Sequence, residues 1–310
     1  MCSSDLATTD VAKALTIRGT QAGRAARLIG AASAPTISVT NVGLRLENLT
    51  VEGRPGDCTV ICFGGSLSVF NSDTDLVNVT LIGSRVWSGG GLYVYSGSVR
   101  LLGSTIVRAG RATLADTNQG GAIGIGGGTV TIAGRSRVIG SRATAGGAAI
   151  SVYNAALLIK GRAQVSGNRT TGDAATGGAI VAEGSYVSIS GSARITGNRA
   201  WGGAGIRLMD GTALDLTGNA LVTGNRTDVT PPGTPDLGGA GILADGSGII
   251  IRFEDKARIT GNKAGAPGLS GGIRMRVGTT LEVDGTPVTC TSKALRAHVF
   301  DNVNGNCVAF

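Results

Sequence analysis

A short motif returns along the second two-thirds of this chain, and its repetition constrains the fold more than any other feature. A Gly-Gly step is followed by a brief apolar alternation and then by a sequence of the type Ile/Val-Thr/Ser-Gly-Asn-Arg. The steps begin at Gly120, Gly146, Gly177, Gly202, Gly238 and Gly271, at intervals of 26, 31, 25, 36 and 33 residues. Self-similarity with such a period is typical of stacked supersecondary units.

Each repeat contains three short runs of alternating apolar residues, separated by Gly, Asn, Ser or Asp turns, which predicts three strands. The connections are too short for the helical crossovers of an open parallel sheet. A coil solves this problem, because three strands form one rung and the next rung lies on top, ~4.8 Å away. We therefore predict an all-β, single-stranded right-handed parallel β-helix, a solenoid of about ten three-strand rungs.

Four asparagines follow a glycine at the same point of successive repeats: Asn168, Asn198, Asn225 and Asn262. Asparagine tolerates the left-handed backbone conformation at a corner. If the four side chains point inward, their amides form a hydrogen-bonded ladder along the rod. The alternative is a set of exposed turn asparagines.

The sequence divides into three segments that differ in composition and repeat pattern. Residues 1–6, Met-Cys-Ser-Ser-Asp-Leu, resemble a translated sequencing adapter, so we expect them to be an artefact that replaces the true start and any secretion signal. Residues 7–284 carry the β-helix pattern. In residues 285–310 glycine becomes sparse, and we expect either a cap on the open end of the rod or the stub of a following domain.

Composition excludes several classes of protein. The 53 glycines lack a Gly-X-Y period, which excludes collagen. No apolar run approaches the ~18 residues of a membrane span, so we expect no transmembrane segment. The formal net charge of +8 favours acidic partners.

Cysteine positions allow one disulfide prediction. Apart from Cys2, the chain has Cys58, Cys62, Cys290 and Cys307. Cys290 and Cys307 are candidates for a disulfide that closes a terminal loop. Cys58 and Cys62 are too far apart to bond within one straight strand, whereas a corner between them would allow a bond and burial would leave free thiols. No histidine lies near these cysteines, and we predict no metal site and no cofactor.

The opening segment and the repeats resemble a known family. Leu15-Thr-Ile-Arg-Gly-Thr20 and Leu46-Glu-Asn-Leu-Thr-Val-Glu-Gly53 are similar to the first rungs of pectin-lyase-like right-handed parallel β-helix proteins. Gly120-Gly-Ala-Ile123 and Ile195-Thr-Gly-Asn198 resemble repeats of polymorphic outer-membrane and autotransporter passenger proteins. The resemblance covers about Leu15 to Asp284. It implies secretion, a place at the bacterial outer membrane or cell surface, and often adhesion.

A basic residue directly follows the corner position in five consecutive repeats: Arg142, Arg169, Arg199, Arg226 and Lys263. Stacked one per rung, they would repel one another by about 0.8 kcal/mol per pair in water. A linear anion with matched charge spacing would relieve that repulsion, and arginine binds carboxylate or phosphate in a bidentate manner. The column is therefore a candidate polyanion-binding surface. The alternative is a solvated corner.

An acidic corner is the remaining constellation. Glu183, Asp210 and Asp245 each precede a Gly-Ser or Gly-Thr turn, and paired carboxylates are the acid and base of glycoside hydrolysis. Asp-Gly is also ordinary turn chemistry. They are weak catalytic candidates, since the chain has a single histidine, His298, in its irregular end.

These patterns predict a noncatalytic secreted or cell-surface β-helix domain of the adhesin or passenger type. Its expected partner is an acidic polysaccharide or a surface glycolipid, without specific nucleic-acid binding. The alternative is a polysaccharide lyase or glycoside hydrolase of pectin-lyase-like fold. Few aromatic residues, 4% of the chain, weigh against sugar stacking.

Overall fold

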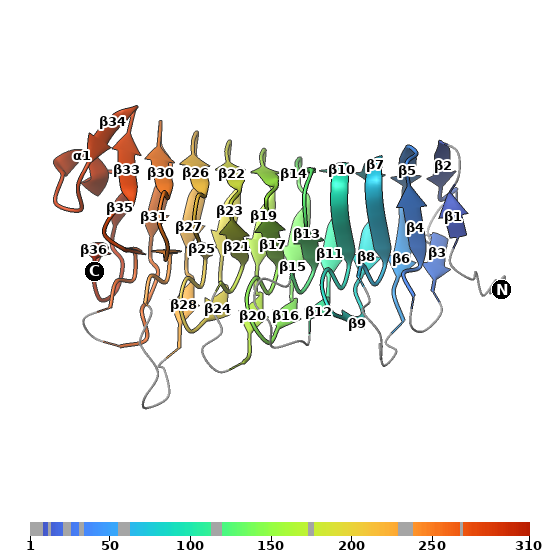
Figure 1. The fold of residues 1–310 in the computed structure, drawn as a ribbon, viewed down its shortest axis with the longest axis horizontal. Helices are drawn as coiled ribbons and strands as arrows, with labels where there is room; N and C mark the ends of the chain where they lie inside the picture. The colour runs from blue at the N-terminus through green and yellow to red at the C-terminus, as the bar shows by residue number, and fades with distance from the viewer. Residues whose placement is uncertain are drawn as a thin grey trace.

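The computed structural model is an elongated, all-β parallel solenoid of the right-handed type with about nine turns (Figure 1). The predicted fold class is confirmed, and the number of turns is near the predicted ten. The structure describes residues 9–11, 14–20, 26–30, 34–54, 63–112, 120–172, 177–228, 238–266 and 269–310. Residues 1–6, Cys58 and Cys62 lie outside these ranges.

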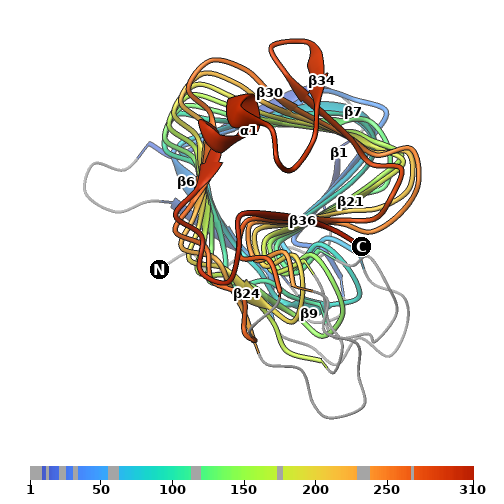
Figure 2. The same ribbon diagram turned by 90° about the vertical axis from the view of Figure 1, so that its left-hand side faces the viewer.

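Three faces enclose the core, as the end view in Figure 2 shows. The first face consists of β1 (Thr9–Val11), β4 (Ile37–Thr40), the first part of β7 (Leu67–Val77) and of β10 (Leu92–Leu102), β13 (Ile123–Ile125), β17 (Ile150–Tyr153), β21 (Ile180–Glu183), β25 (Ile206–Leu208), β29 (Ile242–Ala244), β32 (Ile273–Met275) and β36 (Cys307–Ala309).

The second face is continuous with the first through β7 and β10, which turn the corner between them. Its other strands are β2 (Leu15–Arg18), β5 (Leu44–Glu47), β14 (Thr129–Ile132), β18 (Ala156–Ile159), β22 (Tyr186–Ile189), β26 (Ala213–Leu216), β30 (Ile250–Phe253) and β33 (Thr280–Val283). The third face consists of β3 (Ala26–Ile29), β6 (Leu49–Glu52), β8 (Thr80–Ile82), β11 (Ile106–Arg108), β15 (Arg137–Ile139), β19 (Gln164–Ser166), β23 (Arg194–Thr196), β27 (Leu221–Thr223), β31 (Arg258–Thr260) and β35 (Val299–Phe300).

A fourth strand of two residues extends six of the turns, where the sequence predicted only three strands. These strands form a six-stranded parallel sheet, which we call the short sheet. They are β9 (Arg85–Val86), β12 (Arg111–Ala112), β16 (Arg142–Ala143), β20 (Arg169–Thr170), β24 (Arg199–Ala200) and β28 (Arg226–Thr227). The short sheet follows one long edge of the rod and lies at one corner of its cross-section (Figures 1 and 2). Two residues carry no readable periodicity, which is why the sequence pattern did not reveal them.

The core is built from columns of inward-facing apolar side chains. Ile123, Ile150 and Ile180 occupy successive rungs of the first face in register, and each is fully buried. Val138, Val165 and Ile195 form a matching column on the third face. Because each rung repeats the alternation of the rung below, apolar residues stack on apolar residues in these columns.

The recurring Gly-Gly step has a steric cause. Gly147 has a φ of +60°, a left-handed conformation that L side chains rarely adopt, and a Cβ there would lie 2.7 Å from the Ile150 carbonyl oxygen. Gly177 holds the equivalent place at φ +74°. The left-handed residue is thus the second glycine of one pair and the first of the next, which contributes to the uneven spacing of the repeats.

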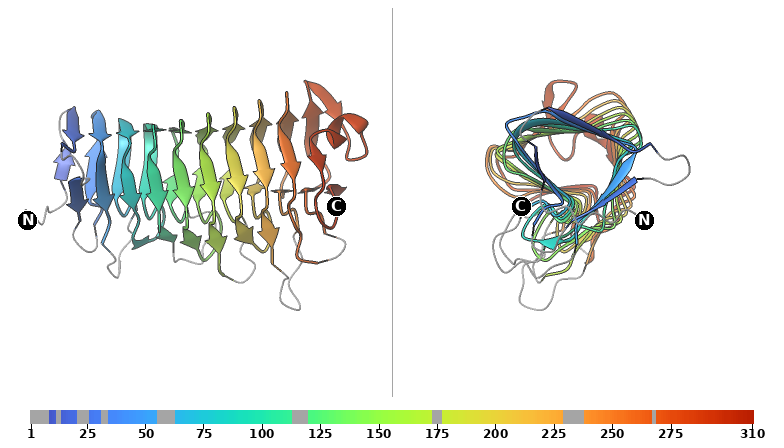
Figure 3. Two further views of the ribbon diagram at one scale, coloured as in Figure 1. Left: turned by 180° about the vertical axis from the view of Figure 1, so that it is seen from behind. Right: turned by 90° about the vertical axis from the view of Figure 1, so that its right-hand side faces the viewer.

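Residues 285–310 cover the C-terminal end of the rod. β34 (Thr286–Val288) folds back antiparallel to β33, and α1 (Lys293–Arg296) follows it. Leu295 and Val299 of this segment are buried in the main core of the rod. Cys290 and Cys307 form a disulfide with a Cα–Cα distance of 5.2 Å, which ties the segment to β36. Figure 3 shows that the first and last strands lie at opposite ends of the rod.

Candidate functional site

Basic residues line the outer side of the short sheet in one unbroken column. Arg142, Arg169, Arg199 and Arg226 pair in register on successive strands, and Arg226 pairs with Lys263 through an isolated bridge. Their side chains are exposed. The five residues singled out from the sequence therefore lie above one another, at the strand spacing of about 4.8 Å.

The column is longer than the sequence analysis predicted. Arg111 pairs with Arg142 on one side and with Arg85 on the other, and both are exposed. We call the complete set the cationic column: Arg85, Arg111, Arg142, Arg169, Arg199, Arg226 and Lys263. A signal for Arg85 was present, since Ile82-Gly83-Ser84-Arg85 is identical to the Ile-Gly-Ser-Arg that ends at Arg142. Six intervals of one strand spacing give the column a length of about 29 Å.

The short sheet presents these side chains because its inner positions are buried. Ala112, Ala143, Thr170 and Thr227 follow the column residues, and each is at most 3% exposed. Ala112 and Ala143 form a small second apolar cluster with Ala148. Alternation along each two-residue strand then directs the basic side chains outward.

A ladder of buried asparagines holds the corner that precedes the column. Asn198, 1% exposed, donates from Nδ2 to Oδ1 of Asn225 at 3.0 Å, and Asn225 donates in the same way to Asn262. Each amide oxygen also accepts the backbone N–H of the preceding asparagine at 3.0 Å. Asn168 makes the same two bonds with Asn198. The structure thus places all four asparagines in one inward column.

Backbone hydrogen bonds connect the asparagine ladder to the cationic column. The backbone N–H of Arg199 donates to the carbonyl of Asn168 at 2.9 Å, and that of Arg226 donates to the carbonyl of Asn198 at 2.9 Å. Lys263 bonds to Asn225 in the same manner. Arg169, Arg199, Arg226 and Lys263 each directly follow a ladder asparagine, so the ladder fixes the register of these four charges. The three remaining column residues follow Ser84, Gly110 and Ser141 instead.

The ladder continues beyond the asparagines that the sequence indicated. Asn262 donates to Asn302 Oδ1 at 3.0 Å, and Asn302 donates to Asn306 at 3.3 Å. Val299-Phe300-Asp301-Asn302 replaces the usual Ile-Thr-Gly-Asn, with Asp301 at φ +51° where Gly261 has +65°. The substitution of glycine by aspartate concealed this copy.

Arginines on the second face, in contrast to the column, are neutralised. Asp75 accepts hydrogen bonds from Arg45 at 3.0 Å and from Arg100 at 2.6 Å, and the three residues lie on adjacent strands. Further along the same face, Arg252 lies between Asp215 and Glu282 at 3.3 and 2.8 Å. These alternating charges stabilise neighbouring rungs against each other.

Asp228 supplies the only counter-charge to the cationic column within the described part of the chain. It forms an ion pair with Arg199 Nε and lies 3.8 Å from a terminal nitrogen of Arg169. Among the described residues, Arg85, Arg111, Arg142, Arg226 and Lys263 form no ion pair. Five further aspartates, Asp5, Asp57, Asp116, Asp173 and Asp236, lie outside the described ranges.

Two carboxylates of the acidic corner are engaged by different partners. Asp210 accepts hydrogen bonds from the backbone N–H and hydroxyl of Ser247 at 2.6 and 3.0 Å, and these bonds hold the pKa of Asp210 below its usual value. Asp245 is bonded to Arg207 at 2.7 Å and Arg276 at 2.6 Å. The turn between β29 and β30 is one residue longer than the turn between β25 and β26, and Ser247 rather than Asp245 contacts Asp210. The Asp-Gly turns that match in sequence therefore do not match in space.

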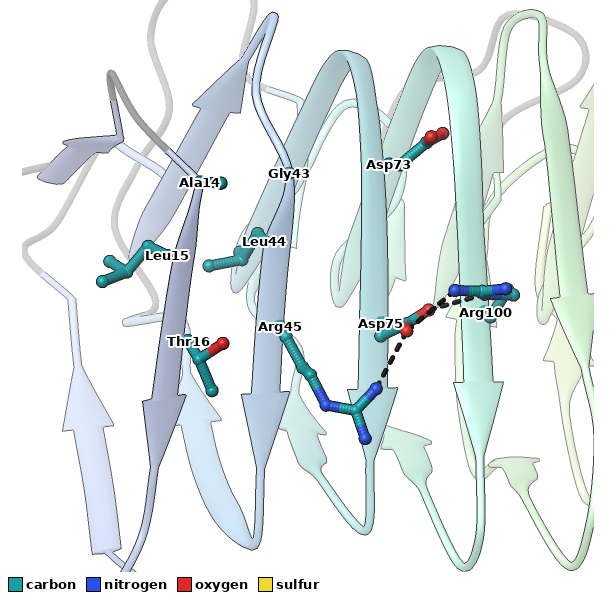
Figure 4. Close-up of a pocket in the computed structure, with 9 residues that line it drawn as sticks. All are labelled: Ala14, Leu15, Thr16, Gly43, Leu44, Arg45, Asp73, Asp75 and Arg100. Atoms are coloured by element: carbon teal, nitrogen blue, oxygen red, sulfur yellow. Dashed lines mark hydrogen bonds and ion pairs between the residues drawn. The ribbon is translucent and has the colours of Figure 1, made fainter.

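A shallow pocket of about 290 Å³ lies on the second face near the N-terminal end (Figure 4). It is lined by Asp73, Asp75, Arg45 and Arg100 among others. Figure 4 shows both arginines reaching Asp75 from the neighbouring strands, with Asp73 apart from them. Tyr95, 55% exposed, precedes the corner on β10. Sequence analysis did not identify this pocket, because it depends on pairing between residues 25 and 30 positions apart.

The described residues contain no group of three or more His, Cys, Asp or Glu side chains placed to hold a metal ion. No helix among them has the length and apolarity needed to cross a membrane. Comparison of the chain with protein-family models, with curated proteins and with solved structures found no match. The fold itself defines the chain as a parallel β-solenoid, whose most distinctive surface is the cationic column.

Proposed function

We propose that this protein is a noncatalytic, secreted or cell-surface β-solenoid of the adhesin or passenger type, which binds a linear acidic polysaccharide along the cationic column. The observation that carries the proposal is the column itself. Seven basic side chains repeat at one strand spacing, and five of them lack a counter-ion among the described residues. An extended polyuronate carries one carboxylate per sugar ring, a repeat close to that spacing.

Aromatic residues beside the column favour a sugar polymer over a simple polyanion. The chain has two tryptophans, and both follow short-sheet strands: Trp87 after β9 and Trp201 after β24. Each is half-buried and lies two positions beyond a column arginine. An indole face next to a guanidinium can stack a sugar ring while the arginine binds its carboxylate.

Secretion is supported by the disulfide and by the sequence resemblance. Disulfides persist in oxidising compartments and are rare in the cytosol. Cys290–Cys307 fits such a location. The resemblance of the repeats to pectin-lyase-like and autotransporter passenger proteins points the same way.

Replacing Arg85, Arg111 and Arg142 together by serine should weaken binding of a labelled oligouronate at least about tenfold. Three charge-assisted contacts of roughly 0.5 kcal/mol each amount to about 1.5 kcal/mol, and about 1.4 kcal/mol corresponds to a factor of ten in affinity. Fluorescence anisotropy at a fixed, moderate salt concentration measures the change, because attraction between exposed charges is screened by salt.

The matched control for this experiment changes Arg135, Arg162 and Arg194 to serine. These three are exposed, form no ion pair in the described structure and lie outside the short sheet, so the net charge falls equally. We expect this control to retain most of the affinity. Equal weakening by both triple variants, or binding that survives the column variant, would eliminate the column as the site.

A second candidate function, a polysaccharide lyase or glycoside hydrolase, is favoured by one observation. The pocket around Asp75 brings two carboxylates and two arginines together on one face. However, Asp75 is engaged by both arginines, which leaves Asp73 without a second carboxylate to act as its acid or base partner.

We therefore expect polyuronate and neutral glycan substrates to remain intact after prolonged incubation with the protein. Reducing-end assays detect hydrolysis, and the ultraviolet absorbance of unsaturated uronate detects elimination. Turnover that disappears in Asp73→Asn would instead establish the pocket as an active site and the protein as an enzyme.

A further inference from the structure

Asp228 is the one acidic side chain that reaches the cationic column in the described structure. It lies two positions after Arg226, on the outer side of β28, because Thr227 between them is fully buried. Its backbone N–H donates to the Ala200 carbonyl at 2.8 Å and continues the pairing of β28 with β24. The described residues at the equivalent place in the other rungs, Trp87, Thr144, Thr171, Trp201 and Gly265, are uncharged.

The carboxylate of Asp228 is shared between two rungs. Oδ1 bonds to Arg199 on the adjacent strand, and Oδ2 lies 3.8 Å from Arg169 one strand further away. The Asp228 side chain is 16% exposed, whereas those of Arg169 and Arg199 are 51% and 45% exposed. The carboxylate thus lies against the column while the arginine side chains remain open to solvent.

We propose that Asp228 occupies the place of one ligand carboxylate, between Arg169 and Arg199, and thereby divides the column into two open segments. This inference rests on the proposed function, since it concerns how the same column takes its polymer. One open segment consists of Arg85, Arg111 and Arg142, and the other of Arg226 and Lys263. A polycarboxylate binds each segment with its carboxylates shared between successive rungs, as Asp228 is shared.

The division of the column determines how the binding affinity depends on polymer length. Three basic residues accommodate a short oligomer, and a longer chain gains nothing further until it displaces Asp228. When Asp228 is neutralised, all seven basic residues form one continuous site. Affinity should then keep rising with polymer length up to about seven sugar units, one for each rung of the column at the strand spacing.

The test compares the wild-type protein with Asp228→Asn, using oligouronates of three and of eight sugar units. For the trimer we expect less than a twofold change. For the octamer we expect at least about tenfold tighter binding by Asp228→Asn, with the slope of log K against log salt steeper by about 3, because four more cations take part. Asp228→Ser serves as a second variant, and thermal unfolding verifies that each variant is folded.

Glu254→Gln is the matched control, because it removes one exposed negative charge from a turn outside the short sheet. A gain that Glu254→Gln reproduces, a gain equal for trimer and octamer, or no gain at all would overturn the role of Asp228 while leaving the proposed function in place. If neither the wild type nor the variants bind either oligomer, the proposed function fails and this inference fails with it. Equal gains for a linear polyphosphate of similar length would show that the column does not select carboxylates.

Discussion

Asn225→Ala is expected to lower the free energy of unfolding by about 4 kcal/mol, because it removes the centre of the buried ladder. Asn225 is fully buried, and its Oδ1 accepts two hydrogen bonds from Asn198, one from Nδ2 and one from the backbone N–H. Its Nδ2 donates to Asn262 Oδ1 and to the Ile195 carbonyl, each at 3.0 Å. Alanine would leave the buried backbone N–H of Asn198 without its acceptor and would remove the amide hydrogen bonds to Asn198, Asn262 and Ile195.

Urea denaturation measures the total effect, and hydrogen exchange shows where it acts. Each rung of a solenoid contacts only its neighbours, so exchange should accelerate most in β23, β27 and β31. Asn219→Ala is the control, since Asn219 belongs to the same turn of the rod but is exposed. It should change the stability by no more than about 0.5 kcal/mol. Equal stability of the two variants would mean that the ladder contributes no net stabilisation.

Gly147→Ala is expected to destabilise the protein by about 3 kcal/mol, through two additive costs. An alanine at φ +60° adopts a conformation that is unfavourable by roughly 1–2 kcal/mol. Its Cβ would also lie 2.7 Å from the Ile150 carbonyl oxygen and 3.3 Å from Ser151 Cβ, so the backbone at the start of β17 must move. Thermal and urea unfolding both measure the loss.

Gly43→Ala provides a control at a glycine without these constraints. Gly43 has no positive φ, and the nearest atoms to a Cβ placed there are 3.9 Å away. Alanine reduces the conformational entropy of the unfolded chain, so this variant should be as stable as the wild type or slightly more stable. If both alanine variants behaved alike, the steric explanation of the Gly-Gly repeat would be wrong.

Asn225→Ala and Gly147→Ala should lower the stability of the protein without altering its proposed binding surface. Asn225 and Gly147 both lie inside the rod or at its corners, away from the outer side of the short sheet. Their replacement should weaken polymer binding only under conditions in which the rungs near them unfold. The column and Asp228 variants, in contrast, alter exposed side chains and should change binding at nearly constant stability.

Positions that align in the sequence repeats are not equivalent in the structure where the turns between strands differ in length. Asp210 and Asp245 match as Asp-Gly dipeptides, yet their carboxylates have different partners, Ser247 for the first and two arginines for the second. Similarly, Asn302 escaped notice because aspartate replaces the glycine before it. The first case arises because hydrogen-bond register, rather than sequence spacing, determines which residues lie above each other. In the second case the turn keeps its left-handed backbone conformation without the glycine.

The sequence by itself determined the solenoid, because the information needed is local. Alternation within four or five residues decides which side chains face inward, and a glycine or asparagine decides where the chain turns, so each repeat specifies its own rung. Only the tertiary structure decided which charges meet. Asp228 and Arg199 are 29 residues apart, and Asp75 and Arg100 are 25 apart, so their contacts depend on the register of separate rungs and on the length of the loops between them. The same pairing register joined Arg85 and Arg111 to the column and left most of its charges without a partner among the described residues.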